Sequence, residues 1–135
     1  MNGRRYLLDV NALVGLMWSV HSLHQKAHAW FARERPIVLG CALTELSFIR
    51  VSMADKTIAA SFRDADEALA RFITALGPRY QYVPAVPPGP LLRGWAVRTH
   101  KEVSDSYLCA LAQANGAELA TLDVGIKHPA ARLIG

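Results

Sequence analysis

Short apolar strands alternate with amphipathic helices along this chain, and that alternation limits the folds it can adopt. Strands are expected at residues 6–8, 37–39, 80–84 and 118–122, with a short final one at 132–134. Apolar residues at helical spacing predict helices that include 23–33, 57–76, 91–99 and one running from Ser104 to about Asn115. Strands alternating with helices form parallel sheets covered on both faces. The predicted fold is therefore an α/β/α sandwich around a mostly parallel sheet.

The length and composition fit one soluble domain spanning residues 1–135. The chain has 135 residues, 52% of them hydrophobic, which is enough to bury a substantial core. Fifteen Lys and Arg against eleven Asp and Glu give a net charge of +4, which weakly favours acidic partners. Cys41 and Cys109 are expected to be buried, free thiols. No stretch approaches the roughly 20 apolar residues of a membrane span, so a cytoplasmic protein is expected.

Four carboxylates, Asp9, Glu45, Asp105 and Asp123, follow predicted strands or begin predicted helices. Asp9 and Asp123 come at the ends of strands. Glu45 lies in the first turn of the helix after the second strand, and Asp105 opens the helix that returns to strand 118–122. With right-handed crossovers, all four positions fall at the carboxyl edge of a parallel sheet, where open α/β sheets bind ligands.

Two of these acids, Glu45 and Asp105, also have a simpler explanation when each is taken alone, whereas Asp9 and Asp123 are harder to explain that way. An acid in a first helical turn offsets the helix dipole, which would account for Glu45 or Asp105. A carboxylate at the end of a buried strand is costly to desolvate without a partner, which is the expected situation of Asp9 and Asp123. One shared cation would satisfy all four acids together. The set is therefore predicted to be a metal site.

Ligands that are all oxygen suit Mg²⁺, with Mn²⁺ as a substitute, better than zinc or copper. One ion, or two ions about 3.5–4 Å apart, would generate hydroxide and stabilise a leaving oxygen. The predicted chemistry is hydrolysis of a phosphodiester bond by a metal-activated water, with no protein nucleophile. Asp9, Glu45, Asp105 and Asp123 are the predicted catalytic and metal-binding residues.

Two polar neighbours of these acids are predicted to support the site. Asn11 and Thr121 would orient Asp9 and Asp123 or hold a metal-bound water. Their alternative roles are structural, with Asn11 as a helix cap and Thr121 as an ordinary strand residue. Both possibilities stay open at this point.

Basic and aromatic side chains supply candidate contacts to a polyanion. The predicted phosphate contacts are Arg50, Arg93, Arg98 and Lys101. Trp95 is flanked by two of these arginines, so it is the best of the three tryptophans for stacking on a base. Their spacing alone does not decide whether any of them meets nucleic acid.

The segments around the acids resemble the PIN-domain ribonucleases, and in particular the VapC toxins of type II toxin–antitoxin systems. The matching segments are Leu7-Leu8-Asp9-Val10-Asn11, Thr44-Glu45 with Arg50-Val51, Val103-Ser104-Asp105-Ser106-Tyr107-Leu108, and Leu119-Ala120-Thr121-Leu122-Asp123. They span nearly the whole chain in the expected order. One departure is that the segment Val124-Gly125-Ile126-Lys127 carries no further acid, which bears on a second metal position.

The resemblance implies a PIN-like three-layer α/β/α sandwich and Mg²⁺- or Mn²⁺-dependent endonucleolytic cleavage of structured RNA. It also implies a homodimer and a small antitoxin protein that inserts a segment into the catalytic groove. Two alternatives are kept. One is a non-catalytic module that binds RNA or a protein partner. The other is a haloacid-dehalogenase-type phosphatase, although Asn11 stands where that family needs a second Asp.

Overall fold

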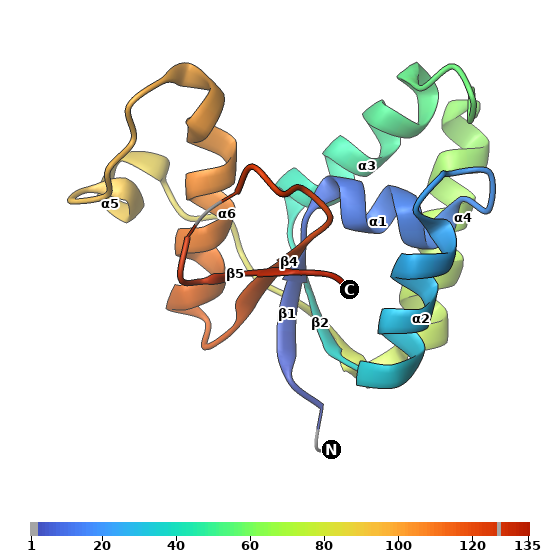
Figure 1. Cartoon of the computed structure of the whole chain (residues 1–135), viewed down its shortest axis with the longest axis horizontal. Coiled ribbons are helices and arrows are strands. Elements are labelled where there is room, and N and C mark those ends of the chain that lie inside the picture. The colour runs from blue at the N-terminus through green and yellow to red at the C-terminus, as the bar shows by residue number, and fades with distance from the viewer. Residues whose placement is uncertain (1–2, 127) are drawn as a thin grey trace.

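A five-stranded parallel sheet forms the centre of the computed structural model, which describes residues 3–126 and 128–135 (Figure 1). The strands are β1 (Arg5–Leu8), β2 (Ile37–Gly40), β3 (Tyr80–Tyr82), β4 (Glu118–Thr121) and β5 (Ala131–Leu133). They lie in the order β3-β2-β1-β4-β5, and every neighbouring pair is parallel. β1 is therefore the central strand, with β2 on one side of it and β4 on the other.

Helices cover both faces of this sheet. They are α1 (Val10–Met17), α2 (His24–Glu34), α3 (Ala42–Ala54), α4 (Phe62–Leu76), α5 (Pro88–Leu92) and α6 (Val103–Ala114), with short 3₁₀ turns η1 (Gly77–Arg79) and η2 (His100–Glu102). Figure 1 shows α1 to α4 on one side of the sheet and α5 and α6 on the other. The predicted three-layer α/β/α architecture is confirmed.

The two-residue period of β1 supplies both cores. Tyr6 and Leu8 face α1 to α4, where the Tyr6 ring meets Trp30 edge-on with 5.2 Å between centroids. Leu7 faces the opposite way and packs in the core that contains Leu111 of α6. Each such side chain contributes about 1.5–3 kcal/mol when fully buried. Because both faces are apolar, β1 carries the continuous hydrophobic run of a central parallel strand.

Two helices differ in extent from the prediction. The helix expected over 57–76 begins only at Phe62, because Ser61 caps it by accepting the Asp64 N–H at 3.0 Å. The residues before it form a turn in which Asp55 accepts the backbone N–H of Thr57 at 2.8 Å. The helix expected over 91–99 is instead the short α5, which begins at Pro88 in a proline-rich segment and ends at Leu92.

Two other helices begin earlier than their sequences predict. Thr44 was a candidate N-cap for the helix after β2, but it does not begin α3. Cys41 is its N-cap, and the buried Thr44 hydroxyl lies one turn in, donating back to the Cys41 carbonyl at 3.1 Å. Ser104 lies inside α6, which begins at Val103. The expectation of buried, free cysteines holds for Cys41 and Cys109. Among the described residues, no helix combines the length and apolar character needed to cross a membrane.

Candidate active site

The parallel sheet brings all four predicted acids to its carboxyl edge. Asp9 directly follows β1 and is the N-cap of α1, with its Oδ1 accepting the Val10 N–H at 2.8 Å. Glu45 lies in the first turn of α3, just after β2. Asp105 lies in the first turn of α6, whose C-terminal end leads back to the start of β4, and Asp123 follows β4. The positions of the acids agree with the topological argument from the sequence.

Asp9 is the buried member of the group, with 4% of its surface exposed. Its second carboxylate oxygen accepts the Thr121 hydroxyl at 2.9 Å. Burial raises the pKa of Asp9, the hydrogen bonds from Thr121 and Val10 oppose that rise, and the charge of Asp123 adds to it. Asp9 is thus a carboxylate fixed in orientation and held in a position that disfavours its negative charge.

Thr121 joins the two strand-end acids through one hydroxyl group. Its Oγ1 donates to Asp9 and accepts the Asp123 backbone N–H at 3.0 Å. Asn11 acts on the same turn, because its Oδ1 accepts the Leu122 N–H at 3.0 Å. The predicted supporting residues therefore tie α1 to the end of β4, and Asn11 is not the helix cap that the simpler explanation proposed.

Asp105 is the third acid of the group and is affected by the charges of the other two. Burial raises the pKa of Asp105, and the charges of Asp9 and Asp123 raise it further. Cys109, one turn further along α6, responds to the same charges. Burial and the nearby Asp105 and Asp9 together raise its pKa to about 11. No Lys, Arg or His of the described residues forms a salt bridge with any of the three acids.

Asp123 differs from the sequence argument in one respect. It was expected to be buried at the end of its strand, but its side chain is exposed. The strand ends at Thr121, and Asp123 begins a turn in which its Oδ1 accepts the Gly125 N–H at 2.8 Å. The desolvation argument therefore holds for Asp9 and fails for Asp123. Lys127, the basic residue that the sequence places near Asp123, lies outside the described residues.

Glu45 lies at the same edge but is held by a different partner. Tyr80, at the start of β3, donates its hydroxyl to Glu45 Oε2 at 2.5 Å. Burial and the hydrogen bond to Glu45 raise the pKa of Tyr80. Gly40 lets the ring pass, because a Cβ at that position would overlap with it. The sequence offered no signal for this pair beyond Tyr80 lying on a predicted strand.

The three coupled acids fit a divalent cation in donor type and charge. All their donor atoms are oxygen, as Mg²⁺ and Mn²⁺ prefer, and no described residue hydrogen-bonds to the Asp105 carboxylate. Within residues 3–126 and 128–135, no three His, Cys, Asp or Glu side chains converge closely enough to share one ion as they stand. Binding by all three would require Asp105 and the exposed Asp123 to turn toward the fixed Asp9.

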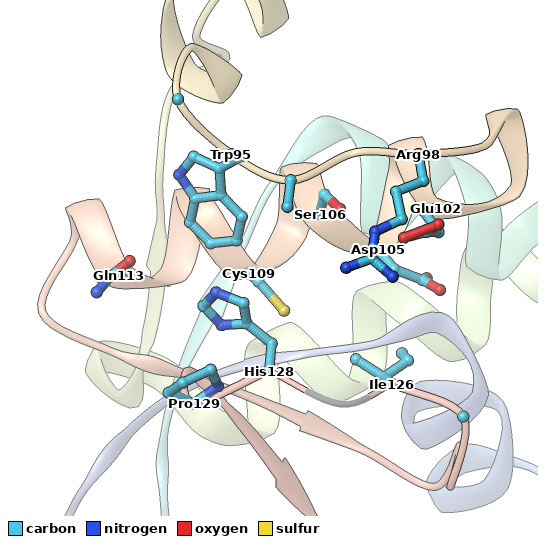
Figure 2. A pocket seen from close by; sticks show the side chains of 13 residues that line it. Trp95, Arg98, Glu102, Asp105, Ser106, Cys109, Gln113, Ile126, His128 and Pro129 are labelled. Atoms are coloured by element: carbon cyan, nitrogen blue, oxygen red, sulfur yellow. The ribbon is translucent and has the colours of Figure 1, made fainter.

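A pocket of about 600 Å³ opens next to Asp105, between α6 and the loops on either side of it (Figure 2). Of the predicted phosphate contacts, Arg98 lines this pocket. Arg50 is exposed on α3, Arg93 follows α5, and Lys101 is exposed in η2. The structure therefore brings one of the four basic residues beside an acid of the site, and the roles of all four remain predictions.

Comparison with known proteins agrees with this architecture. The PIN domain family matches residues 6–131. Ribonuclease VapC38 of Mycobacterium tuberculosis is 35% identical over 126 residues, covering 89% of this chain and 86% of the relative. Ribonuclease VapC29 of the same species is 30% identical, covering 90% of this chain and 88% of the relative. A chain in a toxin–antitoxin complex from Klebsiella pneumoniae has a similar fold, with a TM-score of 0.57, 18% identity and coverage of 94% and 95%.

The fold, the acidic edge and the family match together define the class of protein: the chain belongs to the PIN domain family. The relatives that it matches over most of their length are named VapC, so it is a VapC-type member. Membership of this family removes the basis for the haloacid-dehalogenase alternative. Asn11 stands at the position where that family needs a second Asp, and its side-chain oxygen accepts the Leu122 backbone N–H.

Proposed function

We propose that this protein is an endoribonuclease that acts as the toxin of a toxin–antitoxin pair and hydrolyses RNA phosphodiester bonds. The observation that supports this most directly is the coupling of Asp9, Asp105 and Asp123. The charge of Asp123 adds to the raised pKa of Asp9, and the charges of Asp9 and Asp123 raise the pKa of Asp105. The three acids form no salt bridge among the described residues. The names of the VapC relatives, all ribonucleases, point to the same activity.

The site would hold Mg²⁺ or Mn²⁺ through Asp9, Asp105 and Asp123, with Glu45 as a fourth acid. When bound, such an ion would lower the pKa of water and offset the charge of the phosphate. Asp9 would serve as the fixed ligand, because Val10 and Thr121 hold both of its oxygens in place. Glu45 would have to leave Tyr80, or share its second oxygen, to take part.

RNA and a small antitoxin protein are the proposed partners. The net charge of +4 suits a polyanion, and Arg98, which lines the same pocket as Asp105, would pair with a phosphate next to the acids. The structural neighbour comes from a toxin–antitoxin complex, which favours an antitoxin for this chain as well. A homodimer is proposed on the family resemblance and can be checked by light scattering of the purified protein.

The deciding experiment is RNA cleavage by protein freed of any antitoxin. Wild-type protein should cleave RNA only with Mg²⁺ or Mn²⁺, and Asp9→Asn should abolish cleavage while keeping the fold. Asp64→Asn is the matched control, because Asp64 is an exposed acid in the first turn of α4. If metal-dependent cleavage is absent, the non-catalytic RNA- or partner-binding module becomes the better explanation. Cleavage that survives Asp9→Asn would come from another site or a contaminating nuclease, and would contradict the proposed role of Asp9.

A further inference from the structure

The pocket beside Asp105 has a second end that the proposed hydrolysis does not use. Its volume of about 600 Å³ lies in the usual range for small-ligand sites. Three segments build it, namely the chain between α5 and η2, one side of α6, and the loop between β4 and β5. The side chains that matter here are Trp95, Arg98, Asp105, Ser106, Gln113 and His128.

The two ends of the pocket differ in chemistry (Figure 2). Arg98, Glu102 and Asp105 lie together at the end next to the acids. Trp95 and His128 lie at the other end. The charged lining residues are thus confined to one end, and the other end is aromatic.

The aromatic end is a flat and already ordered surface. The rings of Trp95 and His128 are stacked, with 4.4 Å between centroids and 15° between planes. The His128 ring is fixed, because its Nδ1 accepts the Ala130 N–H at 2.9 Å. The backbone of Trp95 is fixed by turns, donating to Leu92 O at 2.9 Å and accepting the Val97 N–H at 3.0 Å. Little ordering would be needed for another flat ring to join this stack.

Charge decides which part of a nucleotide fits each end. Among the described residues that line the aromatic end, there is no Lys or Arg to pair with a phosphate. A neutral base fits there, because every base can stack on an aromatic ring. Gln113, at the same end, carries an amide that can donate to and accept from a base edge. Arg98 at the other end carries the positive charge that suits the phosphate that follows.

We infer that this pocket binds one unpaired nucleobase of an RNA chain on the Trp95–His128 stack, adjacent to a phosphate at Arg98. The inference rests on the proposed ribonuclease function and specifies its substrate further. A base inside a duplex is stacked on its neighbours and cannot enter, so the chain would select a nucleotide in a loop, bulge or single strand. Trp95 would thereby position the bond to be cut without touching it.

Binding can be tested apart from cleavage in the full-length Asp9→Asn protein. The probes are short oligo(A), oligo(C) and oligo(U), and a ribose-phosphate oligomer of equal length that lacks bases. Tryptophan fluorescence should be quenched by at least one of the base-containing probes, and the Trp95→Phe variant identifies the share of the signal that comes from Trp95. Trp95→Ala should weaken binding of that probe roughly 5- to 150-fold and leave binding of the baseless probe unchanged.

Three further variants test the stack and guard against misfolding and general effects. Trp95→Phe keeps an aromatic ring and should retain most of the affinity, whereas His128→Ala should lose part of it. Phe62→Ala is the matched control, since Phe62 is 59% exposed on α4 and lies outside the pocket. It should bind every probe as the parent protein does.

The possible results separate this inference from the ribonuclease proposal. If wild-type protein cleaves RNA and Trp95→Ala changes neither affinity nor KM, the base pocket is wrong and the nuclease stands. If RNA quenches Trp95 in a protein that never cleaves, the pocket stands and the nuclease is wrong. If Trp95→Ala binds RNA normally but loses affinity for the antitoxin, the pocket serves a protein partner and the inference is overturned.

Discussion

Tyr80 donates its hydroxyl to Glu45 at the carboxyl edge of the sheet, so one of the four candidate acids is held by a neighbouring strand and not by the other three. The ring reaches Glu45 by crossing β2 at Gly40, where no side chain stands in its way. A glycine inside a strand often marks such a close approach. Because of this hydrogen bond, Glu45 would have to move away from Tyr80 before both of its oxygens could bind a metal ion.

Tyr80→Phe should lower the free energy of unfolding by about 1–2 kcal/mol, because the hydrogen bond to a charged group is lost. Gly40→Ala should destabilise by a similar amount, about 1–3 kcal/mol, since its methyl group would displace the Tyr80 ring. Urea unfolding in metal-free buffer measures both. Tyr82→Phe is the control on the same strand, at a tyrosine that is 57% exposed. An equal loss in the control would show that Glu45 gains nothing from Tyr80.

The metal-free protein should become more stable as pH falls from neutral. Burial and neighbouring acids raise the pKa of Asp9 and of Asp105 above the ordinary value of 3.8. The folded state therefore binds these protons more strongly than the unfolded chain does. The resulting stability is full below the ordinary value and is lost as pH rises through the raised values.

Chemical denaturation with EDTA across this pH range measures the effect as a difference between wild type and Asp9→Asn. That difference removes the contribution of all other carboxylates. Asp9→Asn should be the more stable protein at neutral pH, and Asp64→Asn should follow the wild type. Parallel curves for wild type and Asp9→Asn would mean that Asp9 carries no unfavourable charge in the fold.

Thr121→Val should both destabilise the protein and impair the site. Valine has nearly the same shape, so the change removes one hydroxyl from a residue that is 1% exposed. Asp9 then loses a donor and the Asp123 N–H loses an acceptor, at a cost of about 1–3 kcal/mol. Thr121→Ser keeps the hydroxyl and should restore the acidic limb of the pH–activity profile, which Thr121→Val should move to higher pH. Identical pH profiles for the two variants would contradict the role given to the hydroxyl.

Mn²⁺ should raise the melting temperature of the wild-type protein, because an ion that binds only the folded state stabilises it by mass action. Asp123→Ala should remove most of that rise. Asp123 is exposed, so its replacement should change the free energy of unfolding in EDTA by no more than about 0.5 kcal/mol. A Mn²⁺ response that persists in Asp123→Ala would exclude this residue from the metal site.

Much of the sheet and the positions of the acids could be predicted from local patterns. Leu7, Leu8 and Leu119 are fully or almost fully buried, and such unbroken apolar runs indicate central parallel strands. Topology alone then carries Asp9 and Asp105 to one edge, since it depends on the order of elements and not on side-chain detail.

The remaining features arise from contacts between distant residues, which local patterns do not contain. Ser61 shortens α4 because it competes as a cap with an otherwise periodic sequence. The exposure of Asp123 follows from where β4 ends. The stack of Trp95 on His128 joins two loops whose conformations depend on α6 between them. The sequence picked out Trp95 but gave no reason to pair it with His128.

The position of β1 in the middle of the sheet also affects when the site can exist. Asp9 is synthesised before its partner Thr121, which is 112 residues away on a strand that pairs directly with β1. A nascent chain would carry an exposed β1 edge and an unpaired Asp9 until β4 has emerged from the ribosome. A chain that stops before β4 would therefore lack both the strand that pairs with β1 and the hydroxyl group that orients Asp9.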